Sequence, residues 1–138
     1  MTTITIETLL KASIRSVWES WTTPADITHW NFASDDWHCP QAEIDLIVGG
    51  AFNYRMKAKD QSGSFDFAGT FTAVRPYSSL HFELNDGRSV KVEFTETNGS
   101  VRVVESFEAE NIHSIEQQKE GWQSILNNFK KHVETKQR

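Results

Sequence analysis

The amino-acid sequence predicts an α+β fold in which an antiparallel sheet packs against a long C-terminal helix. From Ser114 to Val133, apolar residues recur every three or four positions, as on one face of a helix. From Asp45 to Ala109, apolar and polar residues alternate, as in strands with one buried face. Turn sequences such as Asn85-Asp86-Gly87 divide this stretch into hairpins, and consecutive hairpins favour an antiparallel sheet.

Composition predicts one domain spanning residues 1–138 and excludes several classes of function. The net charge is −5, with no basic cluster beyond Lys130-Lys131, which argues against nucleic-acid binding. No apolar run approaches the roughly 18 residues of a membrane span, and no secretion signal opens the chain. The single cysteine, Cys39, excludes an internal disulfide. We therefore expect a cytoplasmic protein without a membrane or nucleic-acid partner.

The N-terminal third predicts one strand, two short helices and a loop. Alternation over residues 3–11 indicates a half-buried strand, and Ser13 can cap a helix that carries Trp21 on its apolar face. Thr23-Pro24 favours a second short helix reaching about Trp30. Residues 31–43 have no regular period and are predicted to form a loop. The inward residues of the first strand are predicted to be Ile4, Ile6 and Leu9.

The C-terminal helix divides into two halves. Ser114 and Gln117 match a capping box, which predicts the helix start. The apolar stripe is dense from Trp122 to Val133 and thin before Trp122, where Gly121 adds no side chain. We therefore expect the second half to pack on the sheet and the first half to roof a cavity.

Motifs in three parts of the chain carry a family resemblance. The first part holds Ala12-Ser13, Val17-Trp18, Trp21-Thr22, Pro24 and Trp30. The second holds Asp45, Gly49-Gly50-x-Phe52-x-Tyr54, Gly69, Pro76 and Leu80. The third holds Gln118-x-x-Gly121-Trp122, Leu126 and Phe129. Together they cover nearly the full chain and resemble the START-like (SRPBCC) superfamily, in its branch related to the activator of the heat-shock protein 90 ATPase.

The resemblance implies a helix-grip fold, in which a curved antiparallel sheet wraps around the C-terminal helix, with two short helices after the first strand. Members of the superfamily bind lipids, sterols, polyketides or other apolar ligands, and some catalyse cyclisation. The eukaryotic activator engages a chaperone through a longer chain with an additional N-terminal domain. We do not expect that domain within these 138 residues, so the resemblance is weak support for a chaperone partner.

Glu105 is the most informative polar residue, because it lies between Val103 and Phe107 on the apolar face of the last strand. Burial there would raise its pKa and make it a proton donor, a proton acceptor or a ligand anchor. In the alternative interpretation, Glu105 pairs with Arg55 or a tryptophan N–H, or a bulge turns it outward.

Aromatic residues and two glycines of the presumed inward faces allow two interpretations. The aromatic side chains either form a plain core or line a cavity for an apolar ligand. Gly69 and Gly121 either leave space in that cavity or let backbones approach closely. The aromatic set is Phe52, Tyr54, Phe65, Phe67, Phe71, Phe82, Phe94, Phe107 and Trp122.

The predicted loop holds several groups that can carry chemistry. We expect Trp37 and His38 to form a lid or wall over a ligand, with an ordered structural loop as the alternative. His38 and Cys39 are adjacent, but no second cysteine or spaced histidine pair completes a metal site. A cysteine nucleophile would need a positioned base, which sequence adjacency does not establish.

These observations predict a protein that binds a small hydrophobic molecule with one polar end, without a cofactor or metal. The first alternative is a cyclase or hydrolase that uses Glu105 as its acid or base. The second is a chaperone-associated interaction module with a filled core, and an exposed sheet edge could support a homodimer. The predicted ligand-binding residues are Trp30, Trp37, His38, Tyr54, Phe67, Glu105, Gln118 and Trp122.

Overall fold

A computed structural model describes residues 2–136, so the outermost residues of the predicted domain, 1 and 137–138, lie outside the described range. The helices and strands follow the predicted order, with one additional strand after the short helices. They are β1 (Thr3–Leu10), α1 (Ile14–Thr22), α2 (Pro24–Ile27), β2 (Trp37–Ile44), β3 (Ala51–Ala58), β4 (Ser64–Arg75), β5 (Ser79–Leu84), β6 (Ser89–Thr97), β7 (Ser100–Glu108) and α3 (Ile115–Lys136).

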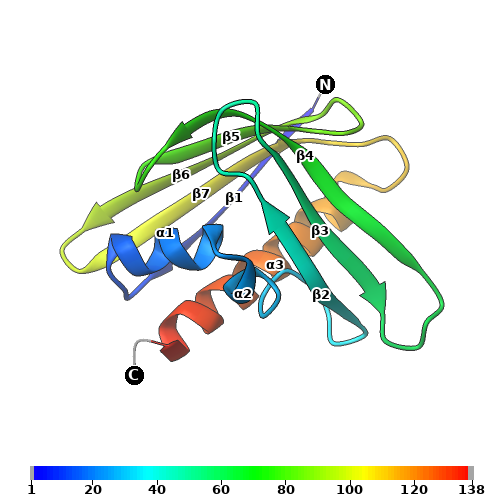
Figure 1. The fold of residues 1–138 in the computed structure, drawn as a ribbon, viewed down its shortest axis with the longest axis horizontal. Helices are drawn as coiled ribbons and strands as arrows, with labels where there is room; N and C mark the ends of the chain where they lie inside the picture. Colours follow the sequence, from blue (N-terminus) through cyan, green and yellow to red (C-terminus); the bar gives the residue numbers. More distant parts are fainter. Residues whose placement is uncertain (1, 137–138) are drawn as a thin grey trace.

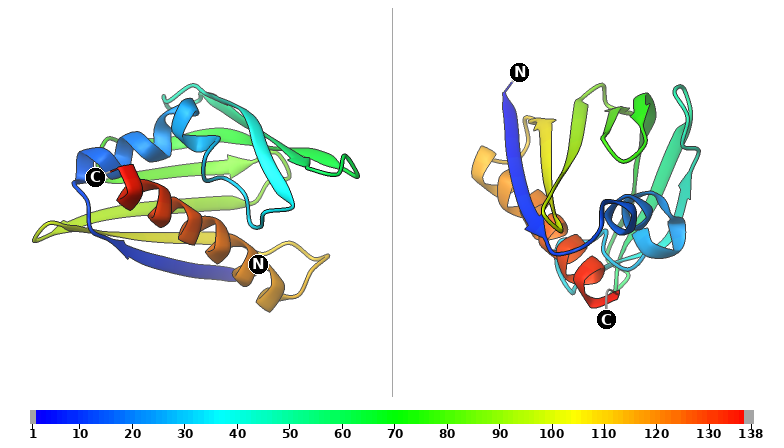
Figure 2. Two further views of the ribbon diagram at one scale, coloured as in Figure 1. Left: turned by 90° about the horizontal axis from the view of Figure 1, so that it is seen from below. Right: turned by 90° about the vertical axis from the view of Figure 1, so that its left-hand side faces the viewer.

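In the described range, the strands form a seven-stranded antiparallel sheet of order β1-β7-β6-β5-β4-β3-β2. Helices α1 and α2 carry the chain from β1 at one edge to β2 at the other, and hairpins then return it strand by strand (Figure 1). The sheet is strongly curved, and α1 and α3 lie over the same face (Figure 2). This architecture confirms the predicted α+β helix-grip fold. No helix within residues 2–136 combines the length and apolarity needed to cross a membrane.

The long helix α3 begins where the capping box predicts. The Gln117 backbone N–H donates to Ser114 Oγ at 3.1 Å, and the Ser114 N–H donates to Gln117 Oε1 at 3.2 Å. The helix continues to Lys136, beyond the predicted end at Val133. Its dense apolar stripe is buried as predicted, through Leu126, Phe129 and Val133.

Polar contacts fix the C-terminal end of α3 to α2. Asp26 Oδ1 lies 2.8 Å from His132 Nε2 and 2.9 Å from Lys136 Nζ, and the same ammonium group donates to Ser20 Oγ at 3.1 Å. Burial by itself raises the pKa of Asp26, but the hydrogen bonds from Lys136 and His132 outweigh it and leave that pKa below its usual value. The carboxylate therefore stays ionised and links the two helices.

Aromatic packing closes the same end of the molecule. The ring centroids of Trp21, Trp30 and Phe129 lie 4.8 to 4.9 Å apart from one another. The Trp30 indole N–H donates to the Ser20 carbonyl at 2.9 Å, which satisfies its one polar atom. This cluster joins α1, the segment after α2, and α3.

The predicted loop over residues 31–43 is wrong in its second half, which forms the edge strand β2. The pairing of β2 with β3 shifts register between His38 and Gln41, around Pro40. A proline has no N–H to donate and is tolerated at a bulge on an edge strand. The bulge breaks the alternation, so the sequence shows no strand period there.

Two smaller predictions are also wrong. The second helix, α2, ends at Ile27, and the segment up to Trp30 continues as hydrogen-bonded turns, such as His29 N–H to Asp26 O at 2.9 Å. In β1, Leu10 is fully buried while Leu9 is 46 % exposed. The end of the strand therefore keeps the alternation set by Ile4 and Ile6.

Gly69 and Gly121 meet different surroundings, and replacing each by alanine should change stability in opposite directions. A Cβ atom at Gly69 would collide with the Glu83 carbonyl oxygen of β5, whereas a Cβ at Gly121 would meet nothing within 4 Å. Gly69→Ala should lower the free energy of unfolding by roughly 1–3 kcal/mol through overpacking. Gly121→Ala should raise it by about 1 kcal/mol, because alanine favours a helix interior. Urea unfolding of both variants measures these changes, and equal effects would contradict the proposed difference in packing.

Candidate ligand pocket

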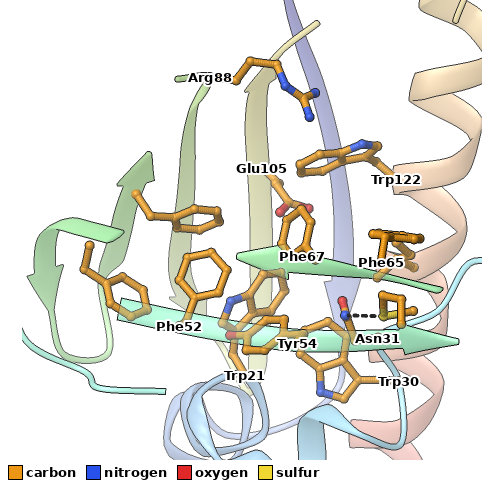
Figure 3. A pocket seen from close by; sticks show the side chains of 14 residues that line it. Trp21, Trp30, Asn31, Phe52, Tyr54, Phe65, Phe67, Arg88, Glu105 and Trp122 are labelled. Carbon is orange, nitrogen blue, oxygen red and sulfur yellow. Dashed lines mark hydrogen bonds between the residues drawn. The ribbon is translucent and has the colours of Figure 1, made fainter. Parts of the chain in front are cut away.

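A pocket of about 200 Å³ lies between the curved sheet and α3 (Figure 3). Its wall is mostly aromatic, and its polar side chains come from different elements. The apolar part of the lining is Trp21, Trp30, Phe52, Met56, Phe65, Phe67, Phe71, Phe82, Trp122 and Ile125. The polar part is Asn31, Tyr54, Arg88 and Glu105. We refer to this set as the inner pocket.

The period of the strands and the position of α3 bring these side chains together. Phe52, Tyr54 and Met56 alternate along β3, so all three point to the concave face. Trp122 of α3 stacks on Phe107 of β7, with ring centroids 3.8 Å apart and planes 9° apart. The Phe67 ring of β4 meets Trp122 edge-on at 5.8 Å. Side chains of α3, β4 and β7 therefore form one continuous aromatic wall.

Glu105 is the central polar group of the inner pocket. Its neighbours across the sheet are Ile6 and Val92, and the residue is only 7 % exposed. Among the described residues, no hydrogen bond or ion pair reaches its carboxyl group. Arg55, one partner considered from the sequence, pairs instead with Asp66 at 3.2 Å. Burial raises the pKa of Glu105 to about 8, so the carboxyl is mostly protonated at neutral pH.

Tyr54 and Asn31 add two further buried polar groups. Tyr54 is 6 % exposed, and within residues 2–136 its hydroxyl has no hydrogen-bond partner. Burial, followed by the charges of Cys39 and Glu105, raises the pKa of Tyr54, so the phenol stays protonated. Asn31 is 7 % exposed, and its amide nitrogen lies 3.4 Å from the Met56 sulfur, a weak acceptor (Figure 3). The Tyr54 phenol and the protonated Glu105 carboxyl are therefore O–H donors for which the described part of the chain supplies no acceptor.

Arg88 links the inner pocket to a more open groove on the outside. Its Nε donates to Asp86 Oδ2 at 2.8 Å, and its Nη1 donates to the Glu108 carbonyl at 3.3 Å. Phe65, Arg88 and Trp122 line both spaces. The rest of this outer groove, which measures about 420 Å³, is formed by Glu110, His113, Gln117, Gln118 and Gly121. The shared wall marks the mouth of the inner pocket.

The structure brings together only part of the predicted ligand-binding set. Trp30, Tyr54, Phe67, Glu105 and Trp122 line the inner pocket.

Trp37, His38 and Gln118 lie outside that lining. Trp37 and His38 belong to the edge strand β2, and the Trp37 ring packs on Phe65 at 5.5 Å. Trp37 therefore contacts the mouth only through its neighbour. The Gln118 amide nitrogen donates to the carbonyls of Glu110 and His113, at 3.1 and 2.9 Å. It holds the segment between β7 and α3.

The predicted placement of the cavity along α3 needs a correction. The sequence predicts that the segment from Ser114 to Gly121 roofs it, but the α3 residues that line the inner pocket are Trp122 and Ile125. The thin part of the stripe faces the outer groove instead, through Gln117, Gln118 and Gly121. The thin stripe therefore indicated an open surface, one turn away from the pocket.

Sequence reasoning did not select Asn31 or Arg88 as site residues. Asn31 follows a short turn, and Arg88 follows the Asn85-Asp86-Gly87 turn, where arginine usually faces solvent. No local pattern distinguishes either residue. For the pocket aromatics Phe52, Phe71 and Phe82, alternation gave the inward face but could not separate a filled core from a pocket. No group of three or more His, Cys, Asp or Glu side chains in residues 2–136 is placed to hold a metal ion.

The elevated pKa of Glu105 should appear as a pH-dependent loss of stability. Between about pH 4.5 and 8, the unfolded chain releases the Glu105 proton while the folded chain keeps it. The free energy of unfolding should therefore fall as pH rises through this window, by up to about 1.4 kcal/mol per pH unit. Glu105→Gln should remove that part of the slope. Urea unfolding of both proteins across the window measures the difference, and parallel curves would contradict the buried carboxylic acid.

Comparison with known proteins agrees with this architecture. The family model described as "Activator of Hsp90 ATPase homolog 1-like protein" matches residues 11–134. No curated protein matches the chain.

Solved structures resemble the chain over nearly its whole length. The AHSA1-like protein from Aeromonas hydrophila is 46% identical with a TM-score of 0.91, over 97% of this chain and 93% of that one. A protein from Cytophaga hutchinsonii is 43% identical with a TM-score of 0.83, over 96% and 92%. A protein from Nitrosomonas europaea shares the fold at 17% identity, with a TM-score of 0.86 over 98% and 96%. The chain therefore belongs to the family of Activator of Hsp90 ATPase homolog 1-like proteins and has the START/SRPBCC-type fold of that family.

Proposed function

We propose that this protein binds a small, mostly apolar ligand with one polar end in the inner pocket. The observation that carries the proposal is Glu105, a buried carboxyl without a partner at the centre of an aromatic pocket. Burying an unsatisfied polar group lowers stability, so its retention in a core supports a role in binding. A concave apolar pocket with a few convergent polar groups is the usual form of a small-molecule site.

The size of the pocket limits the ligand. A dry cavity of roughly 150 Å³ lined by apolar side chains holds one benzene molecule. The inner pocket of about 200 Å³ therefore suits a compact molecule of one or two rings. A longer ligand would extend past Arg88 and Trp122 into the outer groove, which adds about 420 Å³.

The name of the family also points to a chaperone, since it refers to an activator of the Hsp90 ATPase. A module that only presents its surface to a chaperone has no need for an unpartnered acid in its core. Glu105 therefore favours ligand binding over chaperone engagement. The cytoplasmic location and a homodimer stay predictions from the sequence.

An enzyme that uses the same pocket is the second candidate, and Glu105 again supports it. A carboxyl with a pKa of about 8 can give up or accept a proton near neutral pH. Glu105→Gln distinguishes the candidates once a ligand is known: an enzyme would lose turnover while it still binds the ligand. A binding protein would show no turnover in either form.

The ligand-binding proposal predicts that filling the inner pocket abolishes binding. Ile125 of α3 lines the pocket, so Ile125→Phe would add volume within it. The variant should bind a saturating ring compound at least about tenfold more weakly than the native protein, because the new ring and the ligand compete for one space. Native mass spectrometry of the purified protein should first show a bound small molecule, or saturable binding of naphthalene derivatives.

The matched control is Ile115→Phe on the same helix. Ile115 is 43% exposed and lies outside the inner pocket, so this change should leave affinity unaltered. Circular dichroism should show that both variants keep the fold. Equal affinities of the folded Ile125→Phe variant and the native protein would place the ligand elsewhere and overturn the proposal.

A further inference from the structure

The inner pocket contains two buried hydrogen-bonding side chains that the protein itself does not satisfy. Glu105 is 7 % exposed and Tyr54 is 6 % exposed, and neither has a hydrogen-bond partner within the described residues. Both line the same pocket, from β7 and β3 (Figure 3). Native proteins rarely leave such groups without a partner, so in this pocket they pair with ordered water or with a bound molecule that replaces it.

The polar side chains of the pocket can donate hydrogen bonds to a ligand. With its proton retained, Glu105 offers an O–H group, and the Tyr54 phenol offers a second. Arg88 contributes N–H groups at the mouth. The Asn31 amide nitrogen points to the Met56 sulfur, where it is only weakly used. Each of these polar side chains except Arg88 also has an acceptor oxygen, but the acidic O–H of Glu105 is the strongest donor of the set, and the lining carries no anionic group when Glu105 is neutral.

We propose that Glu105 acts as a neutral hydrogen-bond donor that selects a compact ring compound bearing an uncharged acceptor, such as a carbonyl oxygen. This inference rests on the proposed ligand-binding function and specifies its ligand class. The acceptor oxygen lies beside Glu105 and Tyr54, and the rings of the ligand pack against Phe67 and Trp122. Glu105 is thereby the residue that determines specificity.

A cationic ligand fits the pocket less well. Aromatic rings around a carboxylate can bind an ammonium group. Here, however, Glu105 would have to lose its proton first, and Arg88 places a positive charge in the same wall. Binding of a cation would therefore require Glu105 to ionise and would place the charge of the ligand near the like charge of Arg88.

An anionic ligand is also disfavoured. Arg88 is the one cation of the lining in the described part of the chain, and it is already engaged by Asp86 and by the Glu108 carbonyl. A carboxylate ligand would have to compete with Asp86 at 2.8 Å. Transfer of its charge into an aromatic pocket adds a desolvation penalty.

The groups around Glu105 make its protonation easy to follow. Its cross-strand neighbours Ile6 and Val92 are apolar, as is Trp122 of α3, and the titratable groups of the lining are Tyr54 and Arg88. Burial raises the pKa of Tyr54, so its phenol keeps its proton near pH 8. A change of affinity near that pH therefore reports on Glu105 itself.

The test uses four probes that share one ring system and differ in the polar group. They are acetylnaphthalene with a carbonyl, ethylnaphthalene with none, naphthylethylamine with an ammonium, and naphthoate with a carboxylate. Tryptophan fluorescence titration at neutral pH should show acetylnaphthalene binding at least about tenfold tighter than each of the others, the gain expected when a buried donor that otherwise stays unsatisfied finds an acceptor. Above about pH 8, its affinity should fall by about tenfold per pH unit, because ionised Glu105 no longer donates.

Two variants separate a donor from a packing residue. Glu105→Gln keeps an N–H donor, so it should keep the preference for acetylnaphthalene and lose the pH dependence. Glu105→Leu keeps the volume without a donor, so acetylnaphthalene and ethylnaphthalene should then bind alike. Circular dichroism of both variants controls for folding.

The outcomes distinguish this inference from the proposed function. Equal binding of acetylnaphthalene and ethylnaphthalene to the native protein would overturn the donor role while leaving ligand binding intact. Tightest binding of naphthylethylamine or of naphthoate would overturn it in favour of a cation or an anion site. Binding of none of the four would contradict the proposed function as well.

Discussion

The packing of α3 across the curved sheet is the constraint on which the rest of this structure depends. At one end, Phe129 packs against both Trp21 and Trp30, which also contact each other, with ring centroids 4.8 to 4.9 Å apart. Hydrogen bonds from His132 and Lys136 to Asp26 hold the same end from the outside. Aromatic burial and these polar contacts therefore both fix the C-terminal half of the helix.

This arrangement explains why a pocket exists at all. In the middle of α3, Trp122 stacks on Phe107 of the sheet. Trp21 and Trp30 form one end of the inner pocket, and Trp122 lies at its mouth. A strongly curved sheet and a straight helix cannot stay in contact along their whole length. The inner pocket remains open beside Trp122 and Ile125, and the thin part of the stripe on α3 faces the outer groove.

Glu105 places a carboxyl group in the core, where the described part of the chain supplies no hydrogen-bond partner for it. Removing a carboxyl from water without a partner lowers stability, and here the protein avoids a buried charge by keeping the proton. Sites at which a residue lowers stability without local compensation are commonly functional. The same residue therefore connects the stability of the protein, its pH dependence and the proposed selection of its ligand.

The sequence by itself determined the elements and their faces. The capping box at Ser114, the alternation through Glu105 and the turns between strands are local signals, because helix and strand periods depend only on neighbouring residues. Alternation does not predict β2, because a bulge at Pro40 interrupts the strand period. Pairing with β3 makes this segment a strand.

Only the tertiary structure decided which inward residues enclose space. Alternation gives the same pattern for Phe94, which packs edge-on against Trp18 in the core, and for Phe67, which lines the pocket. Arg88 reaches the mouth because its turn lies opposite α3, which no local pattern encodes. The distance between sheet and helix depends on curvature and on contacts between residues far apart in the chain. The sequence therefore determines which faces point inward, while the volume between them is a property of the folded molecule.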